Sequence, residues 1–460
     1  MTPASQAGLT HGRVFRIATP IVLSNATIPL LGAVDTAVIG QLGLSAPIGA
    51  VGLGAVILAT LYWAFGFLRM STSGLAAQAH GAGDSAERSA TLLRALGIAF
   101  GMGLALVAVQ LPFFALAFRI APATDEVETL ARTYLGIRIW GAPATLAIYA
   151  LTGWLVGVER TRAILVLQIW QNGLNALLAI WFVLGLNWGI GGVATATLLA
   201  EITALVLGLW LARDAFGTAL KPAIARFWNP AALRAMVTAS RDIMLRSVIL
   251  QLSFTAFVFL GARFGNDTLA ANQILLQFLS IMAFALDGFA FAAETLVGQA
   301  VGQRSVPALR QATRMCMQWG YGGAVVLALG FALAGGPLID LMTTAVSVRS
   351  EARNFLPWLI AAPLIGTACW IYDGIFIGAL MTGAMVRSAV QVLALYIPAL
   401  MLLVPAFGNH GLWAALMVMN LARGVTLHRA FPGIEAGLER DEFSGNQNNR
   451  NSRSSLGERQ

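Results

Sequence analysis

Asp35 is a carboxylate in the middle of an apolar run. It lies in PLLGAVDTAVIG, residues 29–40, and no other ionisable residue follows Arg16 until the next predicted loop. A charged side chain at membrane depth costs about 2.5–3.5 kcal/mol on insertion scales, so such residues indicate function. A carboxylate with no basic residue in its own segment can take up and release a proton or bind a cation. We therefore interpret Asp35 as an ion-coupling, proton-binding residue.

Four polar residues recur every seven positions in the segment 268–300. They are Gln273, Ser280, Asp287 and Glu294. Seven residues are nearly two helical turns, with about 20° of drift, so the four side chains share one helix face. A polar face toward lipid is unfavourable, and the stripe is expected to face a cavity or partner helices. All four are candidate substrate-cavity residues, with a structural network as the alternative. Glu294 is nearer the inner surface and could instead pair with arginines there.

Other polar residues also lie inside apolar segments. Asp373, in YDGIFIGA, and the amides Asn172 and Asn175 are further candidates for a substrate cavity, although the amides could instead only bridge helices. Glu201 is interpreted mainly as a structural hydrogen-bonding residue. Arg69 is expected to extend its charged group to the inner surface.

The composition is typical of a helical membrane protein. Of 460 residues, 58% are hydrophobic and only 11% are charged, against about 25% charged in soluble proteins. Apolar blocks of roughly 20 residues recur along the chain, the length that crosses a bilayer as a helix. They lack the alternation of a β-barrel. The net charge of +8 is therefore attributed to loops that set topology rather than to nucleic-acid binding. Cys316 and Cys369 lie in apolar surroundings and indicate neither a metal site nor a disulfide.

Twelve membrane spans are predicted, in an all-α polytopic fold. The run after Arg16 is too long for the apolar region of a signal peptide, so it is interpreted as a retained first span. The predicted spans are approximately 15–40, 47–79, 93–118, 131–157, 162–185, 189–212, 240–262, 268–300, 311–335, 353–380, 386–407 and 410–428.

The basic residues predict the orientation of these spans. With both termini inside, 22 of the 29 arginines and lysines fall in inner segments, among them Arg246 and Arg423. Six fall in outer segments, among them Arg138, and Arg69 lies within a span. This bias follows the positive-inside rule and predicts cytoplasmic termini. The deep charges are expected to be mainly acidic, with Arg69 the one exception.

An internal repeat divides the chain. GQLGLSAP (40–47) pairs with GARFGNDT (261–268), AQAHG (77–81) with GQAVG (298–302), and NWGIGG (187–192) with NHGLWA (409–414). The shift is always 221 to 223 residues, and one shift across several places indicates a duplicated unit. The predicted organisation is an N-lobe (1–212), a cytoplasmic linker (213–239), a C-lobe (240–432) and a disordered cytoplasmic tail (433–460).

The acids do not follow the repeat. At these shifts Asp35 aligns with Ala256 or Phe257, and Asp287 aligns with Phe65. Acids needed to pack a duplicated fold would be expected in pairs. Their one-sided placement favours a role in the chemistry of a site.

At these residues the sequence resembles the multidrug and toxic compound extrusion (MATE) family, in particular its DNA-damage-inducible protein F (DinF) branch. The stretches that carry the resemblance include PLLGAVDTAVIGQLG, WAFGFLRMSTSGLAAQAHGAGD, LDGFAFAAETLVGQAVG and DGIFIGA, spread between residues 15 and 425. The resemblance implies two pseudo-symmetric six-helix lobes around a central cavity. It also implies export of mostly cationic, amphipathic compounds coupled to entry of protons or sodium.

The resemblance also implies roles for single residues. Asp35 stands where family members carry the cation-linked acid of helix 1, and Pro20 matches a proline where that helix bends. Asn175 and Asp373 match polar positions of helices 5 and 10. Many relatives have an acid four residues after that asparagine, where this chain has Ala179. The missing oxygen ligand favours protons over sodium.

The sequence therefore predicts a secondary multidrug antiporter in a bacterial inner membrane. Its expected partners are amphipathic or cationic small molecules, H⁺ (or Na⁺) and membrane lipids. It is expected to act as a monomer without cofactor, metal or nucleic acid. The alternatives are a sodium-coupled exporter and a flippase for a lipid-linked precursor, which requires a strongly basic cavity. An intramembrane enzyme or an ATP-driven pump is disfavoured, since the chain has no HExxH, GxSxG or GxxxxGK[ST] motif.

Overall fold

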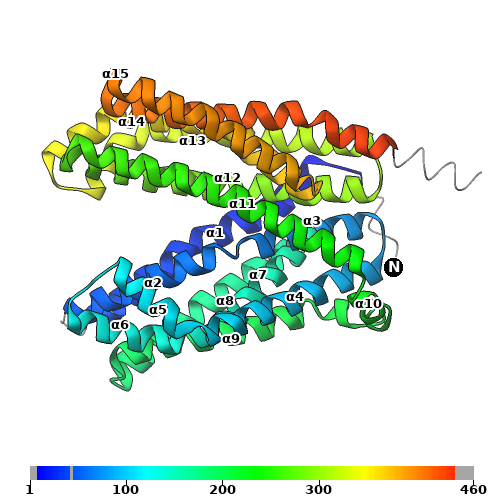
Figure 1. Ribbon diagram of the computed structural model, residues 1–460, viewed down its shortest axis with the longest axis horizontal. Helices are drawn as coiled ribbons and strands as arrows, with labels where there is room; N and C mark the ends of the chain where they lie inside the picture. Colours follow the sequence, from blue (N-terminus) through cyan, green and yellow to red (C-terminus); the bar gives the residue numbers. More distant parts are fainter. Residues whose placement is uncertain (1–7, 42–44, 441–460) are drawn as a thin grey trace, which may run out of the picture. The chain divides into compact units, whose positions relative to one another are not determined.

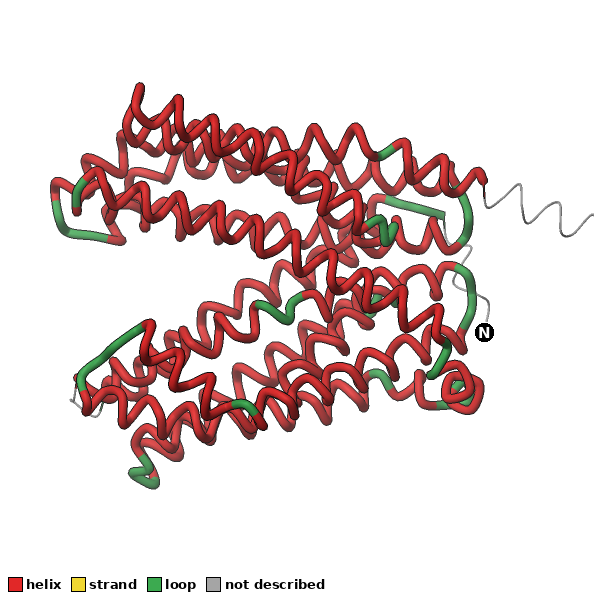
Figure 2. Tube along the Cα trace, in the orientation of Figure 1, coloured by secondary structure: helices red, strands yellow, loops and turns green. Residues whose placement is uncertain are grey.

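The computed structural model describes residues 8–41 and 45–440, apart from the side chains of residues 28–33. Within these ranges the regular elements are all helical (Figures 1 and 2). The α-helices are α1 (His11–Gly40), α2 (Ser45–Trp63), α3 (Phe67–Gly81), α4 (Ser85–Ala108), α5 (Gln110–Ile120), α6 (Asp125–Arg138), α7 (Ala142–Gly157), α8 (Thr161–Ile180), α9 (Gly189–Leu211), α10 (Leu220–Phe227), α11 (Pro230–Gly261), α12 (Asn266–Gly302), α13 (Val306–Met342), α14 (Val346–Gly378) and α15 (Thr382–Ala430). The all-helical class predicted from the sequence is confirmed.

Ten stretches in the described part of the chain are long and apolar enough to cross a membrane. Nine of them overlap one predicted span each, from Ser45–Gly81 to Val346–Gly378. The tenth, Thr382–Arg440, contains both of the last two predicted spans. The first predicted span coincides with α1, which is helical from His11 to Gly40 but is not among the ten.

The tenth stretch consists of two helical arms joined at Gly408. This residue has φ 56° and ψ −131° inside α15, a conformation that side-chain-bearing L-residues rarely adopt. The kink separates the predicted spans 386–407 and 410–428. Length and apolarity alone therefore identify a single candidate span here, whereas the backbone conformation at Gly408 divides it into two helical arms.

Two predicted irregular segments contain helix. Residues 213–239, expected to be a linker, include a turn of 3₁₀ helix, α10 and the start of α11. Arg94 of α4 donates hydrogen bonds to the carbonyls of Phe227 (3.1 Å) and Arg226 (2.6 Å), which attaches α10 to α4. Residues 433–440, expected to begin a disordered tail, are helical. The rest of that predicted tail, 441–460, lies outside the described residues.

The chain separates into two compact units. One contains Thr19–Ala76 and Ser85–Ser240. The other contains the described residues up to Ala18, then Ala77–Asp84 and the residues from Arg241 onward. We call them the N-unit and the C-unit. These units differ from the predicted lobes in assigning residues before Thr19 to the C-unit, and the lobe boundaries stay a prediction.

The N-unit has its core among α2, α4 and α6–α9. Helix α4 packs on α7, α8 on α9, and α6 on both α2 and α9. Trp154 of α7 is fully buried, and its indole N–H donates to the Arg88 carbonyl at 2.9 Å. Three acids in the first turn of α6, the first of them Asp125, lie near the positive end of its helix dipole. These acids stabilise the start of α6, the helix that carries Arg138 at its other end.

The C-unit has its core where α14 packs against α12, α13 and α15. Phe257 and Trp413 meet edge to face there, with ring centroids 5.2 Å apart. Asn272 Oδ1 accepts hydrogen bonds from Asn409 Nδ2 (3.0 Å) and Trp413 Nε1 (2.9 Å). These buried polar groups are therefore satisfied, and they hold the kink of α15 against α12.

Candidate functional site

Asp35 is buried near the C-terminal end of α1. Its residue is 6% exposed, and its Oδ1 atom has no hydrogen-bond partner among the described residues. The carboxylate has a side-chain hydrogen bond with Asn175 of α8 and interacts with the charges of Arg138 and Glu201. A buried oxygen without a partner in a native fold calls for an explanation such as a proton or ligand site.

Arg138 and Glu201 form a buried ion pair beside Asp35. The guanidinium of Arg138 donates from Nη1 to Glu201 Oε2 (2.7 Å) and from Nη2 to Oε1 (2.9 Å). The two side chains are 8% and 5% exposed. Because each carboxylate oxygen accepts one hydrogen bond, the bidentate pair fixes the orientation of the Arg138 guanidinium. Gly141 makes room for it, because a Cβ atom there would overlap Glu201 Oε2.

Four helices, α1, α6, α8 and α9, bring these groups together. Thr197 and Glu201 are four residues apart on α9 and therefore share a face. Thr197 Oγ1 accepts a hydrogen bond from Asn175 Nδ2 at 2.8 Å, which joins α8 to that face. Tyr134 lies one turn before Arg138 on α6 and hydrogen-bonds to it. We call Asp35, Arg138, Asn175, Thr197 and Glu201 the N-unit polar cluster.

Asn172 fixes α8 to α1 two turns before Asp35. Its Nδ2 donates to both the carbonyl and the hydroxyl of Thr27, each at 3.0 Å. Its Oδ1 accepts from Gln168 at 3.3 Å. The structure thus gives Asn172 a helix-bridging contact, one of the two roles predicted for it. Helix α1 continues through Pro20, and the bend predicted there stays a prediction.

A second buried acid, Asp373 of α14, has a different environment. Its Oδ2 atom accepts hydrogen bonds from Arg246 of α11 and from Arg423 of α15. Both arginine side chains are 8% exposed. Arg423 also interacts with the charge of Asp287 on α12. Asp373 is therefore held by two cations, whereas Asp35 has no direct ion pair among the described contacts.

The polar stripe of α12 changes environment along its length. Gln273 and Ser280 are exposed on the C-unit, Asp287 is half-buried and Glu294 is buried. The Ser280 hydroxyl donates to its own helix, at the Leu276 carbonyl (3.0 Å). Asp287 interacts with the charge of Arg423, one of the two arginines at Asp373. The four residues of the stripe therefore do not share one environment.

The expectation that Arg69 is the one basic exception among the deep charges is wrong. Arg138, Arg246 and Arg423 are each 7% exposed and lie inside candidate membrane spans. Each lies close to the end of a predicted span, where sequence position alone does not distinguish it from a loop residue. The sequence does contain one signal for such buried arginines, namely an acid deep in a span, such as Glu201. Because buried charges are generally paired, an acid of this kind predicts a basic partner on another helix.

The chain is similar to known proteins along most of its length. The MatE family model matches residues 20–181 and 243–403. The DNA damage-inducible protein F of Escherichia coli (strain K12) is 39% identical over 421 residues, which cover 90% of each chain. The probable multidrug resistance protein NorM of Neisseria meningitidis serogroup B is 27% identical over 352 residues, 74% of this chain and 75% of the relative.

The fold has close counterparts among solved structures. A crystal structure of MATE in the bent conformation superposes with a TM-score of 0.82 at 18% identity, covering 93% of this chain and 96% of the other. At that identity the likeness concerns the fold alone. The family model and the DinF match together show the relationship: the chain is an integral membrane transporter that belongs to the MatE family, in the branch of DNA damage-inducible protein F.

Proposed function

We propose that this chain is a secondary active exporter, which moves cationic and amphipathic compounds out of the cell in exchange for protons. The observation that carries the proposal is the buried Asp35 carboxylate, whose Oδ1 atom has no partner in the described structure. A group of this kind can change its protonation without breaking an existing ion pair. NorM of Neisseria meningitidis, named as a probable multidrug resistance protein, supports the substrate class.

The charges of the N-unit polar cluster support a proton-coupled mechanism. With all groups ionised, Asp35, Glu201 and Arg138 carry one net negative charge. Because both Glu201 oxygens accept from Arg138, that negative charge resides at Asp35. A proton entering from outside makes the cluster neutral and weakens its attraction for a cationic substrate. Coupling requires that the proton affinity of Asp35 differ between the inward- and outward-facing states.

The same cluster favours protons over sodium. Hard cations prefer several oxygen ligands. Glu201 is engaged by Arg138, and the buried Ala179 stands where relatives carry a further acid. Within the described N-unit polar cluster, Asp35 is therefore the one carboxylate that has an oxygen atom free to bind a cation or a proton. The sodium-coupled exporter remains the alternative for the same site.

Transport is proposed to use twelve helices in two pseudo-symmetric lobes that rock about a central cavity. The two segments matched by the family model begin 223 residues apart, which agrees with the repeat shift in the sequence. In this proposal Asn172, Asn175, Gln273, Ser280, Asp287, Glu294 and Asp373 border the cavity. Asp373 contributes less to coupling, since its charge is already balanced by arginines. The protein acts as a monomer in the bacterial inner membrane, with both termini cytoplasmic.

The flippase alternative gains one supporting observation. Two buried arginines, Arg246 and Arg423, surround one aspartate in the C-unit. Phosphate groups are bound by arginine forks, and an anionic lipid-linked substrate would need such groups. Both guanidiniums are already engaged by Asp373, however, so this observation ranks below the Asp35 carboxylate, which has no ion pair among the described contacts.

The test is transport by Asp35→Asn in proteoliposomes, with pH and sodium gradients imposed separately. We expect loss of proton-driven efflux of a cationic dye, because the amide cannot exchange a proton. Asp125→Asn, at an exposed acid in the first turn of α6, serves as the control and should transport normally. Size-exclusion profiles establish that both variants are folded.

Three results would contradict the proposal. If the folded Asp35→Asn variant shows proton-driven efflux at the wild-type rate, then Asp35 is not required for proton coupling. Wild-type efflux driven by sodium but not by a pH gradient establishes the sodium alternative. Movement of a phosphate-bearing lipid without dye transport would establish the flippase.

A further inference from the structure

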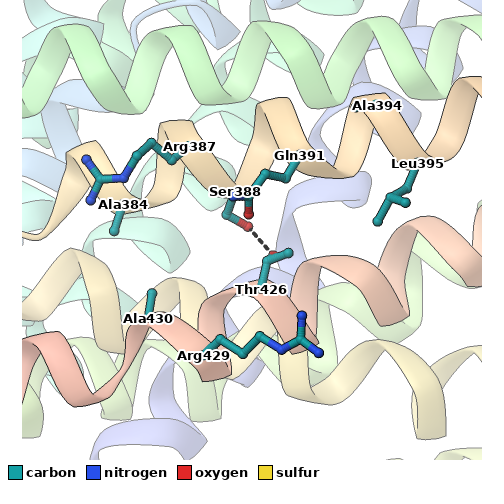
Figure 3. Close-up of a pocket in the computed structure, with 9 residues that line it drawn as sticks. All are labelled: Ala384, Arg387, Ser388, Gln391, Ala394, Leu395, Thr426, Arg429 and Ala430. Atoms are coloured by element: carbon teal, nitrogen blue, oxygen red, sulfur yellow. Dashed lines mark hydrogen bonds between the residues drawn. The ribbon is translucent and has the colours of Figure 1, made fainter.

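A pocket of about 560 Å³ lies between the two arms of α15 in the C-unit. Figure 3 shows Arg387, Ser388 and Gln391 on one arm and Thr426 and Arg429 on the other. The transport mechanism above uses none of these residues.

The pocket has two cations with no acid bound to them. Arg387 and Arg429 are exposed, and no ion pair joins either of them to a carboxylate of the described chain. Asp242, an acid of the same region, is already held by Arg241 (2.9 Å) and by the Thr382 hydroxyl (3.0 Å). The pocket is therefore basic and selects for an anion.

The wall between the arginines is polar, and one end of the pocket is apolar. The hydroxyls of Ser388 and Thr426 are hydrogen-bonded across the two arms at 2.6 Å. Toward the middle of the helix the lining changes to Ala394 and Leu395, and Leu395 is 52% exposed. A ligand that fits this order has an anionic head and an apolar continuation.

The position of the arginines along α15 matches the depth of lipid headgroups. Arg387 precedes the kink residue Gly408 by 21 residues, and Arg429 follows it by 21. At 1.5 Å per residue each arm spans about 31 Å, close to the roughly 30 Å thickness of the hydrocarbon core. With the kink at one membrane surface, both arginine residues lie near the headgroup level of the opposite leaflet. Between these levels the arms expose apolar side chains such as Met401 (72%) and Leu402 (71%).

We propose that this pocket binds an anionic phospholipid, with its phosphate between Arg387 and Arg429 and an acyl chain along Leu395. Basic pockets between transmembrane helices are suited to anionic headgroups. In the orientation proposed above the lipid comes from the inner leaflet. A lipid bound in this pocket connects the two arms of α15 at the ends that lie farthest from the kink.

The test is native mass spectrometry of the purified full-length protein, titrated separately with phosphatidylglycerol, phosphatidylcholine and inorganic phosphate. Wild-type protein is expected to retain phosphatidylglycerol at least about tenfold more tightly than phosphatidylcholine. Arg387→Gln/Arg429→Gln should lose this preference, because each arginine near a surface contributes to attraction of anionic lipid. Ala394→Trp keeps both charges but fills the apolar end, and should also weaken retention.

The matched control is Arg162→Gln/Arg314→Gln, which removes the same charge at two exposed arginines outside the pocket and should retain the preference. Equal retention of the two lipids by wild-type protein overturns the proposal. An equal loss in the control and pocket variants shows generic surface attraction and also overturns it. Displacement of the lipid by millimolar inorganic phosphate, with Ala394→Trp unaffected, shows a free-anion site instead of a lipid site.

Discussion

Two buried aspartates show how much the neighbours of a residue decide its role. Asp35 and Asp373 are 6% and 9% exposed, and each lies within an apolar helix. Arginines from two other helices hold Asp373, whereas Arg138, which interacts with the charge of Asp35, is paired with Glu201. A buried pair is expensive to break by removing one partner. Asp373 is thus suited to a fixed structural charge, and Asp35 to one that changes.

Gly141→Ala tests the geometry of the buried pair beside Asp35. The added Cβ would overlap Glu201 Oε2, so the carboxylate must move away from Arg138. We expect a loss of about 1–3 kcal/mol, the usual cost of overpacking, seen as a lower unfolding temperature in detergent. Gly136→Ala on α6 is the control, since nothing lies within 4 Å of its added Cβ. Equal melting of both variants would show that the pair tolerates the shift.

Helix α15 illustrates how one residue divides an element. By length and composition alone, Thr382–Arg440 is one apolar stretch, although it is too long for a single crossing of a bilayer. Gly408 provides the backbone conformation that reverses the chain, and the Asn272, Asn409 and Trp413 contacts hold the kink in place. The two arms then lie together, which creates the basic pocket at their far ends (Figure 3).

Gly408→Ala should destabilise the C-unit through backbone strain. A side chain at φ 56° and ψ −131° is expected to cost about 1–3 kcal/mol. Packing does not add to this cost, because the nearest atom to an added Cβ is 3.7 Å away. The comparison is Gly330→Ala, in the interior of α13 with open space around it, where alanine should stabilise by up to about 1 kcal/mol. Thermal unfolding followed by circular dichroism distinguishes the two; a neutral Gly408→Ala would mean that the kink relaxes.

At the scale of the whole molecule, charge bias and internal repetition predict the topology. The bias does not depend on the buried arginines, because with Arg138, Arg246 and Arg423 left out, 20 arginines and lysines remain in inner segments and 5 in outer segments. Loop arginines and lysines set orientation by favouring the cytoplasmic side. Two matched segments that begin 223 residues apart are consistent with halves of the same orientation.

Labelling of single cysteines tests this topology. The native Cys316 and Cys369 are fully buried and can be replaced by alanine to give a clean background. A membrane-impermeant maleimide added to intact cells should label Thr124→Cys and Thr344→Cys, both in outer loops of the proposed topology. Thr218→Cys, in the inner connection after α9, should react only after permeabilisation. Labelling of Thr218→Cys in intact cells would reverse the orientation, and labelling of all three would contradict the map of spans.

The sequence by itself determined the helical membrane class and most span positions, and it singled out Asp35 as a candidate for function. Each of these depends on local composition or on the cost of a charge in an apolar run, which are properties of a segment alone. Only the tertiary structure decided which charges are paired. Arg138 and Glu201 are separated by 63 residues, and Arg246 and Asp373 by 127. No spacing rule links such positions, because their pairing depends on how separate helices pack. The same packing leaves Asp35 Oδ1 without a hydrogen-bond partner in the part of the chain that the structure describes, and its proposed role depends on this feature.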